Sequence, residues 1–187
     1  MLRSHKSAIL LGCGIVALTA GFNGLLFAHM PAYLGQVLGY DSPSVTVAMN
    51  IALLAMSLSL LGVSWWADRV PPQRLLRASS ALLLVGAPLA YALLARGDAN
   101  LKLVLPLLAI AAAGANGSFA YLLASLFPAR VRFSGVALSL NISFTLLSGL
   151  GPLAANALIG ASGWLAAPGL IISAVALAGL GASFRIR

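Results

Sequence analysis

The charged residues of this chain are confined to the borders of long uncharged segments. Of 187 residues, eleven are Lys or Arg and three are acidic. The uncharged segments between them cover residues 7–40, 42–67, 78–95, 103–129 and 133–184. Each is long enough to cross a bilayer, which takes about 20 apolar residues, and the last is long enough to cross it twice. Soluble domains carry about 25% charged residues, whereas this chain carries 7%. The sequence therefore predicts an integral membrane protein.

The hydropathy pattern predicts an all-α membrane protein that forms one bundle of six transmembrane helices. The expected spans are residues 8–28, 45–67, 75–95, 103–126, 135–159 and 164–184. These spans occupy almost the whole sequence, which leaves no stretch for a soluble domain. The basic N-terminus followed by an apolar run is also typical of a secretory signal. Because the run continues to Phe27 and residues 17–20 make a poor cleavage site, we expect an uncleaved first span.

The basic residues predict an orientation for this bundle. With a cytoplasmic N-terminus, nine basic residues fall on the cytoplasmic side and only Arg96 and Lys102 on the outer side. This distribution follows the positive-inside rule, so both termini are expected in the cytoplasm. The net charge of +8 does not indicate a nucleic-acid partner, because the basic residues lie at span ends without interleaved aromatic residues.

A short motif recurs in the first and fourth spans. Residues 21–24 and residues 114–117 both read G-x-N-G, and both lie past the middle of their span. Both spans also end near a proline, Pro31 or Pro128. The pattern indicates two three-helix units of opposite topology, although Gly and Ala are abundant enough here for a chance match. Inverted repeats of this kind are common in secondary transporters, which bind substrate near the bilayer midplane.

The inventory of reactive side chains argues against an enzyme. The three acidic residues are aspartates in loops, and the two histidines, His5 and His29, lie near opposite faces of the membrane. Catalysis would require a nucleophile with a base, a carboxylate pair or a metal cluster, and the sequence offers no such set. We therefore expect no catalytic residues, no metal and no cofactor.

Polar residues inside the spans are the remaining candidates for function. In the fifth span, Asn141, Thr145, Ser148, Pro152 and Asn156 recur at steps of three and four, which places them on one helical face. A polar stripe is costly against lipid, so it is expected to face protein or water. Two alternatives remain open, namely the wall of a cavity and hydrogen bonding to a neighbouring helix.

The same two alternatives apply to the asparagines of the repeated motif. The candidate substrate-pathway residues are Asn23, Asn116, Asn141, Thr145 and Ser148. Tyr33 and Tyr121 lie near span ends, where a tyrosine is more often an interfacial anchor than a ligand. Arg77 lies near the cytoplasmic end of the third predicted span, and no charged residue lies deeper inside the six spans. Any coupling acid or substrate-binding arginine would thus be on another polypeptide, or missing; His29 is the residue near a span that ionises close to neutral pH.

Two loops and a span end carry a family resemblance. After the fourth span, residues 126–141 read LFPARVRFSGVALSLN, after the second span residues 67–74 read ADRVPPQR, and residues 30–34 read MPAYL. Over the whole chain, and in order, the sequence resembles the C-terminal half of a major facilitator superfamily transporter. It is most similar to the metabolite:proton symporter branch, which includes citrate, α-ketoglutarate, shikimate and proline/betaine carriers.

The resemblance implies a fold position and a function. The six spans would correspond to helices seven to twelve of a twelve-helix carrier in the bacterial inner membrane, and the function would be proton-coupled symport of a small organic acid or zwitterion. The implied partners are the lipid bilayer, the solute, protons and a six-helix N-terminal half that could be a separate polypeptide. Four residues match the family's cytoplasmic gating positions: Asp68, Arg69, Arg130 and Arg132.

Departures from the family pattern keep a second function open. Pro71 and Pro72 replace the loop glycine and basic residues of the family, and Ser125 replaces its usual acid. The chain could pair with a separate half, self-associate or be inactive alone. The alternative is a non-transporting membrane protein that serves as an assembly partner or scaffold.

Overall fold

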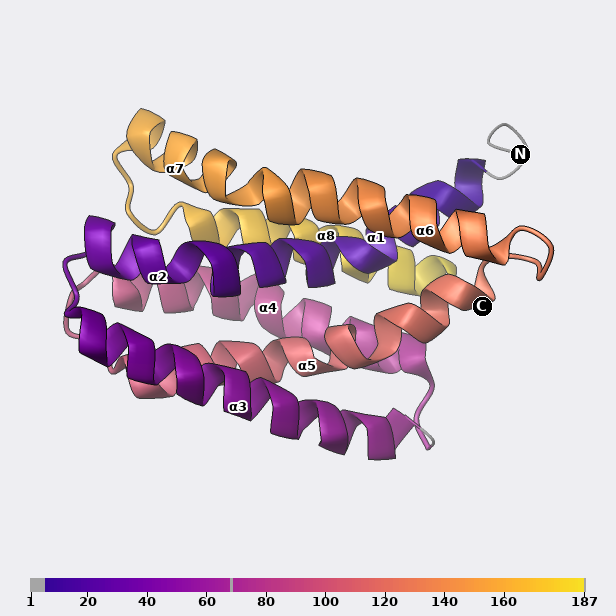
Figure 1. The fold of residues 1–187 in the computed structure, drawn as a ribbon, viewed down its shortest axis with the longest axis horizontal. Coiled ribbons are helices and arrows are strands. Elements are labelled where there is room, and N and C mark those ends of the chain that lie inside the picture. Colours follow the sequence, from indigo (N-terminus) through magenta and orange to yellow (C-terminus); the bar gives the residue numbers. More distant parts are fainter. Residues whose placement is uncertain (1–5, 68, 187) are drawn as a thin grey trace.

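The structure, a computed structural model, describes residues 6–67 and 69–186 and is an all-helical bundle (Figure 1). In these residues, six helical spans are long and apolar enough to cross a membrane. Spans two, three, four and six are single helices: α3 (Ser42–Ala67), α4 (Pro72–Leu94), α5 (Leu101–Ser125) and α8 (Pro168–Arg185). The predicted all-α fold with six spans is confirmed.

Spans one and five are interrupted by π-helical segments. Span one consists of α1 (Lys6–Asn23), η1 (Gly24–His29), α2 (Met30–Ala32) and η2 (Tyr33–Val37). Span five consists of α6 (Arg132–Ser143), η3 (Phe144–Gly149) and α7 (Gly151–Ser162). In η1, η2 and η3 the backbone bonds run five residues back instead of four, an arrangement that is frequent at functional sites.

Span one extends further than the sequence predicts. The predicted range 8–28 stops before Pro31, whereas the helical span runs from Lys6 to Val37. The backbone N–H of Met30 bonds to the carbonyl of Leu25 in the π-helical pattern, and Pro31 follows within the first turn of α2. Because the first turn of a helix needs no donor from proline, the helix continues. Tyr33 consequently lies inside the bundle, 1% exposed, so its expected role as an interfacial anchor is wrong. Tyr121 is 66% exposed.

Local signals define the ends of the other helices. The side chain of Asn100 accepts a hydrogen bond from the backbone N–H of Lys102 and caps α5. At the end of α7, Gly163 takes a left-handed conformation with φ of 66°, which the missing Cβ of glycine allows. α7 therefore ends at Ser162, and the connection to span six begins at Gly163.

Basic residues gather at one end of the bundle. The start of α1, the end of α8 and the α3–α4 and α5–α6 connections all lie at that end (Figure 1). The described basic residues there are Lys6, Arg69, Arg74, Arg77, Arg130, Arg132 and Arg185. The opposite end carries Arg96 and Lys102 together with Asp41 and Asp98. The fold thus keeps the charge asymmetry from which the orientation was predicted.

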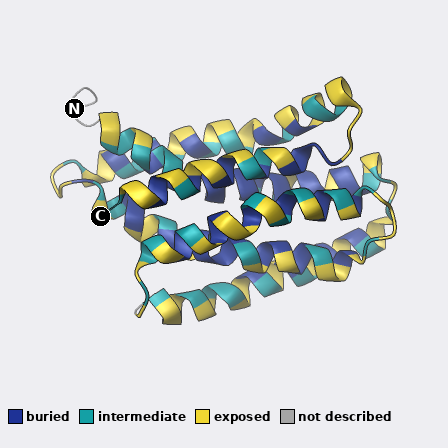
Figure 2. Ribbon diagram, turned by 180° about the vertical axis from the view of Figure 1, so that it is seen from behind, coloured by how far each residue is buried: buried dark blue, intermediate teal, exposed yellow. Residues whose placement is uncertain are grey.

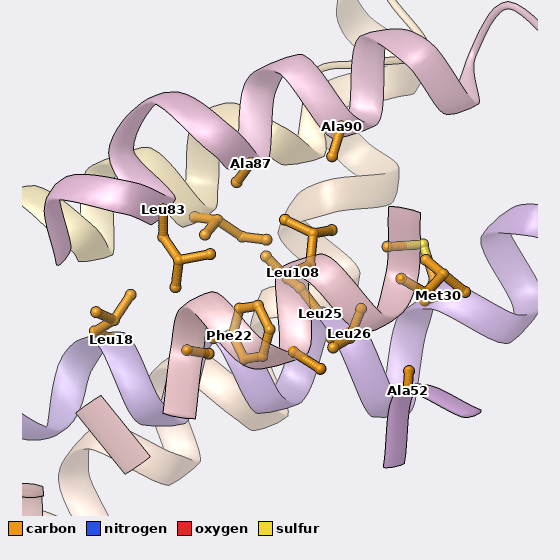
Figure 3. Close-up of a cluster of buried hydrophobic side chains, with 14 of the residues drawn as sticks. Leu18, Phe22, Leu25, Leu26, Met30, Ala52, Leu83, Ala87, Ala90 and Leu108 are labelled. Atoms are coloured by element: carbon orange, nitrogen blue, oxygen red, sulfur yellow. The ribbon is translucent and has the colours of Figure 1, made fainter. Parts of the chain in front are cut away.

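Span one lies at the centre of the bundle and span five at its edge. In their most apolar stretches, 67% of span one is buried, against 17% of span five. Leu18, Phe22 and Leu25 of span one pack against residues of α4 and α5, among them Leu83 and Leu108 (Figure 3). Figure 2 shows exposed residues along the outer faces of the bundle, where many are leucines suited to lipid.

The glycines of the two G-x-N-G motifs contact spans that the predicted repeat pairs with each other, span three with span six and span two with span five. A Cβ on Gly21 would meet Val175 of span six, and one on Gly114 would meet Ser79 of span three. The last glycine of each motif behaves in the same way, because Gly24 lies against span five and Gly117 lies against span two. An inverted repeat that exchanges spans one to three with spans four to six requires this pairing. These contacts support the predicted pseudo-symmetry.

Candidate functional site

The two asparagines of the repeated motif bond to each other. Asn23 Nδ2 donates to Asn116 Oδ1 at 3.0 Å, and Asn116 Nδ2 donates to the carbonyl of Ala112 at 3.1 Å. Asn23 Oδ1 is buried and has no partner within the described residues. The bond joins the two positions that the predicted repeat pairs with each other.

The polar stripe of span five lies partly on the exposed surface of that helix and partly against span one. Asn141 and Thr145 are exposed, and Asn141 donates to its own helix at the carbonyl of Ala137. Ser148 is half-buried and lies against Gly24, where a Cβ would sit 2.6 Å from the Ser148 Cα. The close contact therefore joins the two π-helical segments η1 and η3.

The five candidate pathway residues form two groups. Asn23 and Asn116 bond across helices, which is one of the two predicted alternatives, whereas Asn141 and Thr145 face outward. Ser148 lies between the groups. A shared role in a substrate pathway remains a prediction for these five residues.

A third polar contact involves a residue outside the predicted set. His29 Nε2 lies 2.9 Å from Asn156 Oδ1 on α7, and the imidazole stacks on Tyr33 with ring centroids 5.6 Å apart. Tyr33 in turn donates to the carbonyl of Leu165 at 2.7 Å. The sequence places His29 at the outer end of the first span, but the side chain is only 3% exposed. The presence of Asn156 in the polar stripe was the one signal that could have indicated this contact.

A cavity adjoins the histidine between spans one and five. It has a volume of about 320 Å³, and its lining includes His29, Tyr33, Gln36 and Asn156. Gln36 is exposed, so its amide is free to bind a polar group that enters from outside. The cavity has both hydrogen-bond donors and acceptors in its wall, as sites for small polar solutes do.

The predicted gating residues occupy loops at the basic end. Asp68 lies outside the described residues. The guanidinium of Arg69 lies 3.9 Å from the centroid of the Trp65 ring, and Arg130 is exposed. Arg132 Nε donates to the carbonyl of Phe127 at 3.2 Å. Arg69 and Arg132 therefore contact residues of their own chain segment.

The loop after the fourth span has a structural explanation. The buried ring of Phe127 lies directly against Gly135, where any Cβ would overlap it. With the Arg132 bond to the Phe127 carbonyl, this contact turns the chain from α5 into α6. The phenylalanine, arginine and glycine of the motif thus fit together as one compact turn.

Arg77 makes an interhelical contact that the sequence did not predict. Its guanidinium donates to the carbonyl of Ser183 at 3.1 Å and lies 4.0 Å from the centroid of the Phe184 ring. A cation at the C-terminal end of a helix is favourable, because the last carbonyls there lack partners. Arg77 of α4 therefore stabilises the end of α8.

Comparison with known proteins supports the resemblance drawn from these motifs. The chain is 32% identical over 173 residues, 92% of its length, to the ectoine/proline transporter ProP of Corynebacterium glutamicum. The chain is related to the major facilitator superfamily transporters. It spans about a third (34%) of the length of ProP, and the proline/betaine branch of the superfamily fits the match. No protein-family model matches the chain, and no solved structure matches it.

Proposed function

We propose that the chain is one six-helix unit of a secondary transporter that carries a small zwitterion or organic acid together with protons. The match to an ectoine/proline transporter over 92% of the chain is the observation that carries this proposal. Under this proposal, the six spans take the place of helices seven to twelve of a twelve-helix carrier in the bacterial inner membrane, and both ends of the chain lie in the cytoplasm. The basic end of the bundle would then be the cytoplasmic end.

A second six-helix unit would complete the transport pathway. Span five exposes Asn141 and Thr145, and polar groups exposed on a membrane helix favour a protein or water neighbour over lipid. The second unit could belong to the same polypeptide, be a separate one or be another copy of this chain. The solute would pass between the two units, along the face that carries these residues.

The gating role of the loop residues belongs to the same proposal. Arg69 follows α3, and Arg130 and Arg132 precede or begin α6, at the same end of the bundle (Figure 1). Asp68 precedes Arg69 in the sequence and lies outside the described residues. Opposite charges at helix ends can stabilise one of two packings of a carrier. We expect Asp68→Asn to change how accessible residue 145 is to a reagent added from outside the cell.

Uptake of labelled proline and ectoine tests the function. The chain would be expressed in bacteria that lack their own uptake systems, alone and with the part of ProP that the match leaves uncovered. Uptake that exceeds that of the ProP part alone and collapses with a protonophore is expected. If the chain adds no uptake with either solute but co-purifies with the ProP part, the assembly-partner alternative replaces the transport proposal.

A further inference from the structure

His29 has one satisfied and one unsatisfied ring nitrogen. An amide oxygen only accepts hydrogen bonds, so the contact with Asn156 Oδ1 requires the proton on Nε2. Nδ1 then carries a lone pair. It is buried and has no hydrogen-bond partner within the described residues. Buried polar atoms in folded proteins are nearly always paired, so this nitrogen calls for an explanation.

Few ionisable groups surround this imidazole. Tyr33 stacks on it, and Tyr91 of α4 lies behind Tyr33 with ring centroids 5.5 Å apart. The elements packed against η1 and α2 include α3, η3 and α7, which contain no charged residue or histidine. At this end of the bundle, the charged residues are Asp41, Arg96, Asp98 and Lys102, in or beside the loops. A proton on His29 would therefore face aromatic rings and amides instead of a carboxylate.

We propose that His29 is the proton-binding residue of this transporter unit, an inference that rests on the proposed function. A proton from the water on one side of the membrane binds the Nδ1 lone pair, and the same proton later leaves Nδ1 to the water on the other side. No other bond is made or broken. The imidazolium is stabilised by the face of Tyr33 and by a charge-assisted bond to Asn156. The adjoining cavity then gains a positive charge that attracts a carboxylate.

Nuclear magnetic resonance of the imidazole tests proton binding without any transport assay. In the His5→Gln variant of the whole chain, His29 is the remaining histidine, and ¹⁵N-histidine labelling in nanodiscs reports both of its nitrogens. We expect the Nε2–H tautomer at alkaline pH and a reversible change to the doubly protonated ring when the sample is acidified. A ring that stays neutral, or stays charged, throughout the acidification overturns the proposal.

Two substitutions separate proton binding from helix packing. His29→Gln keeps an N–H that can donate to Asn156 but cannot titrate, whereas His29→Ala removes the bond as well. We expect both variants to lose proton-driven accumulation of solute and His29→Gln to retain exchange of solute across the membrane. Accumulation by His29→Gln at the native level would overturn the proposal. If the unsubstituted chain moves no solute, alone or with the ProP part, the transport function fails, and the resonance titration still decides the proton site.

Discussion

Replacing Gly24 by alanine is expected to push spans one and five apart. The added Cβ would lie 2.6 Å from the Cα of Ser148 and 2.9 Å from its carbonyl oxygen. Carbon atoms pack at about 3.5–4.0 Å, so the helices must separate by about 1 Å. The opposing atoms belong to the backbone and cannot rotate away. Overpacking of this kind costs about 1–3 kcal/mol, and we expect a loss of that size in the free energy of unfolding.

Unfolding in mixed micelles with increasing SDS, followed by far-ultraviolet circular dichroism, measures this loss. Gly86→Ala in α4 is the matched control, because a Cβ there meets nothing within 4 Å. Alanine is the better helix former by about 1 kcal/mol, so the control should be neutral or stabilising. Adding Ser148→Gly to Gly24→Ala should restore little, since the Cα and carbonyl remain. Equal stability of Gly24→Ala and the native chain would refute the close contact between η1 and η3.

Three further outcomes follow from the described contacts. A double-mutant cycle with Asn23→Ala and Asn116→Ala, measured by the same unfolding experiment, should give a coupling of about 0.6 kcal/mol and at most about 1.7; independent effects would contradict the bond. In a cysteine-free chain, a cysteine at position 145 should react rapidly with a small polar thiol reagent and one at position 23 slowly; similar rates would contradict the exposed position of Thr145. Hydrogen bonds from Ser44 hold the pKa of Asp41 below its usual range, so this stabilisation is present above about pH 4 and is lost as the pH falls through the lowered value. The amide resonance of Ser44 should follow that titration, and Asp41→Ala should abolish it.

Composition predicts the spans because a bilayer leaves the chain little choice. Each apolar stretch must satisfy its own backbone hydrogen bonds, and a helix is the way to do so within one segment. The turn at Gly163 and the cap at Asn100 likewise depend on neighbours in sequence. The G-x-N-G motif predicts a contact between the two units because a close packing of helices and a cross-helix bond both require small and polar residues at fixed spacing.

The rotation of one helix against another is not visible in hydropathy. His29 and Tyr33 are buried because span one continues past Pro31 and turns these rings toward α7 and α4. A π-helical turn shifts all later residues around the helix axis, so a 3.6-residue pattern drawn from Lys6 places them on the wrong face. Arg132 shows a second limit of sequence patterns. Its match to a gating position does not predict its bond to the Phe127 carbonyl, because that bond depends on how the chain turns between α5 and α6.

The contacts of span five indicate how a proton on His29 could act at a distance. Span five packs mostly on span one, and three of its contacts there involve polar or small residues: Ser148 with Gly24, Asn156 with His29, and Ser143, which donates to the Cys13 carbonyl at 3.4 Å. The apolar contacts of span five lie mostly in α6 and η3, where Val136, Leu140 and Phe144 belong to the cluster around Val16 and Ala20, whereas α7 adds Ala155 and Ile159 to the core. A helical segment held by few apolar contacts shifts at less cost than one within the core. Protonation strengthens one of these contacts, the His29–Asn156 bond, and leaves the other two unchanged. The chemical change at η1 is therefore transmitted first to α7, so the half of span five that carries Asn156 is where a linked movement should begin.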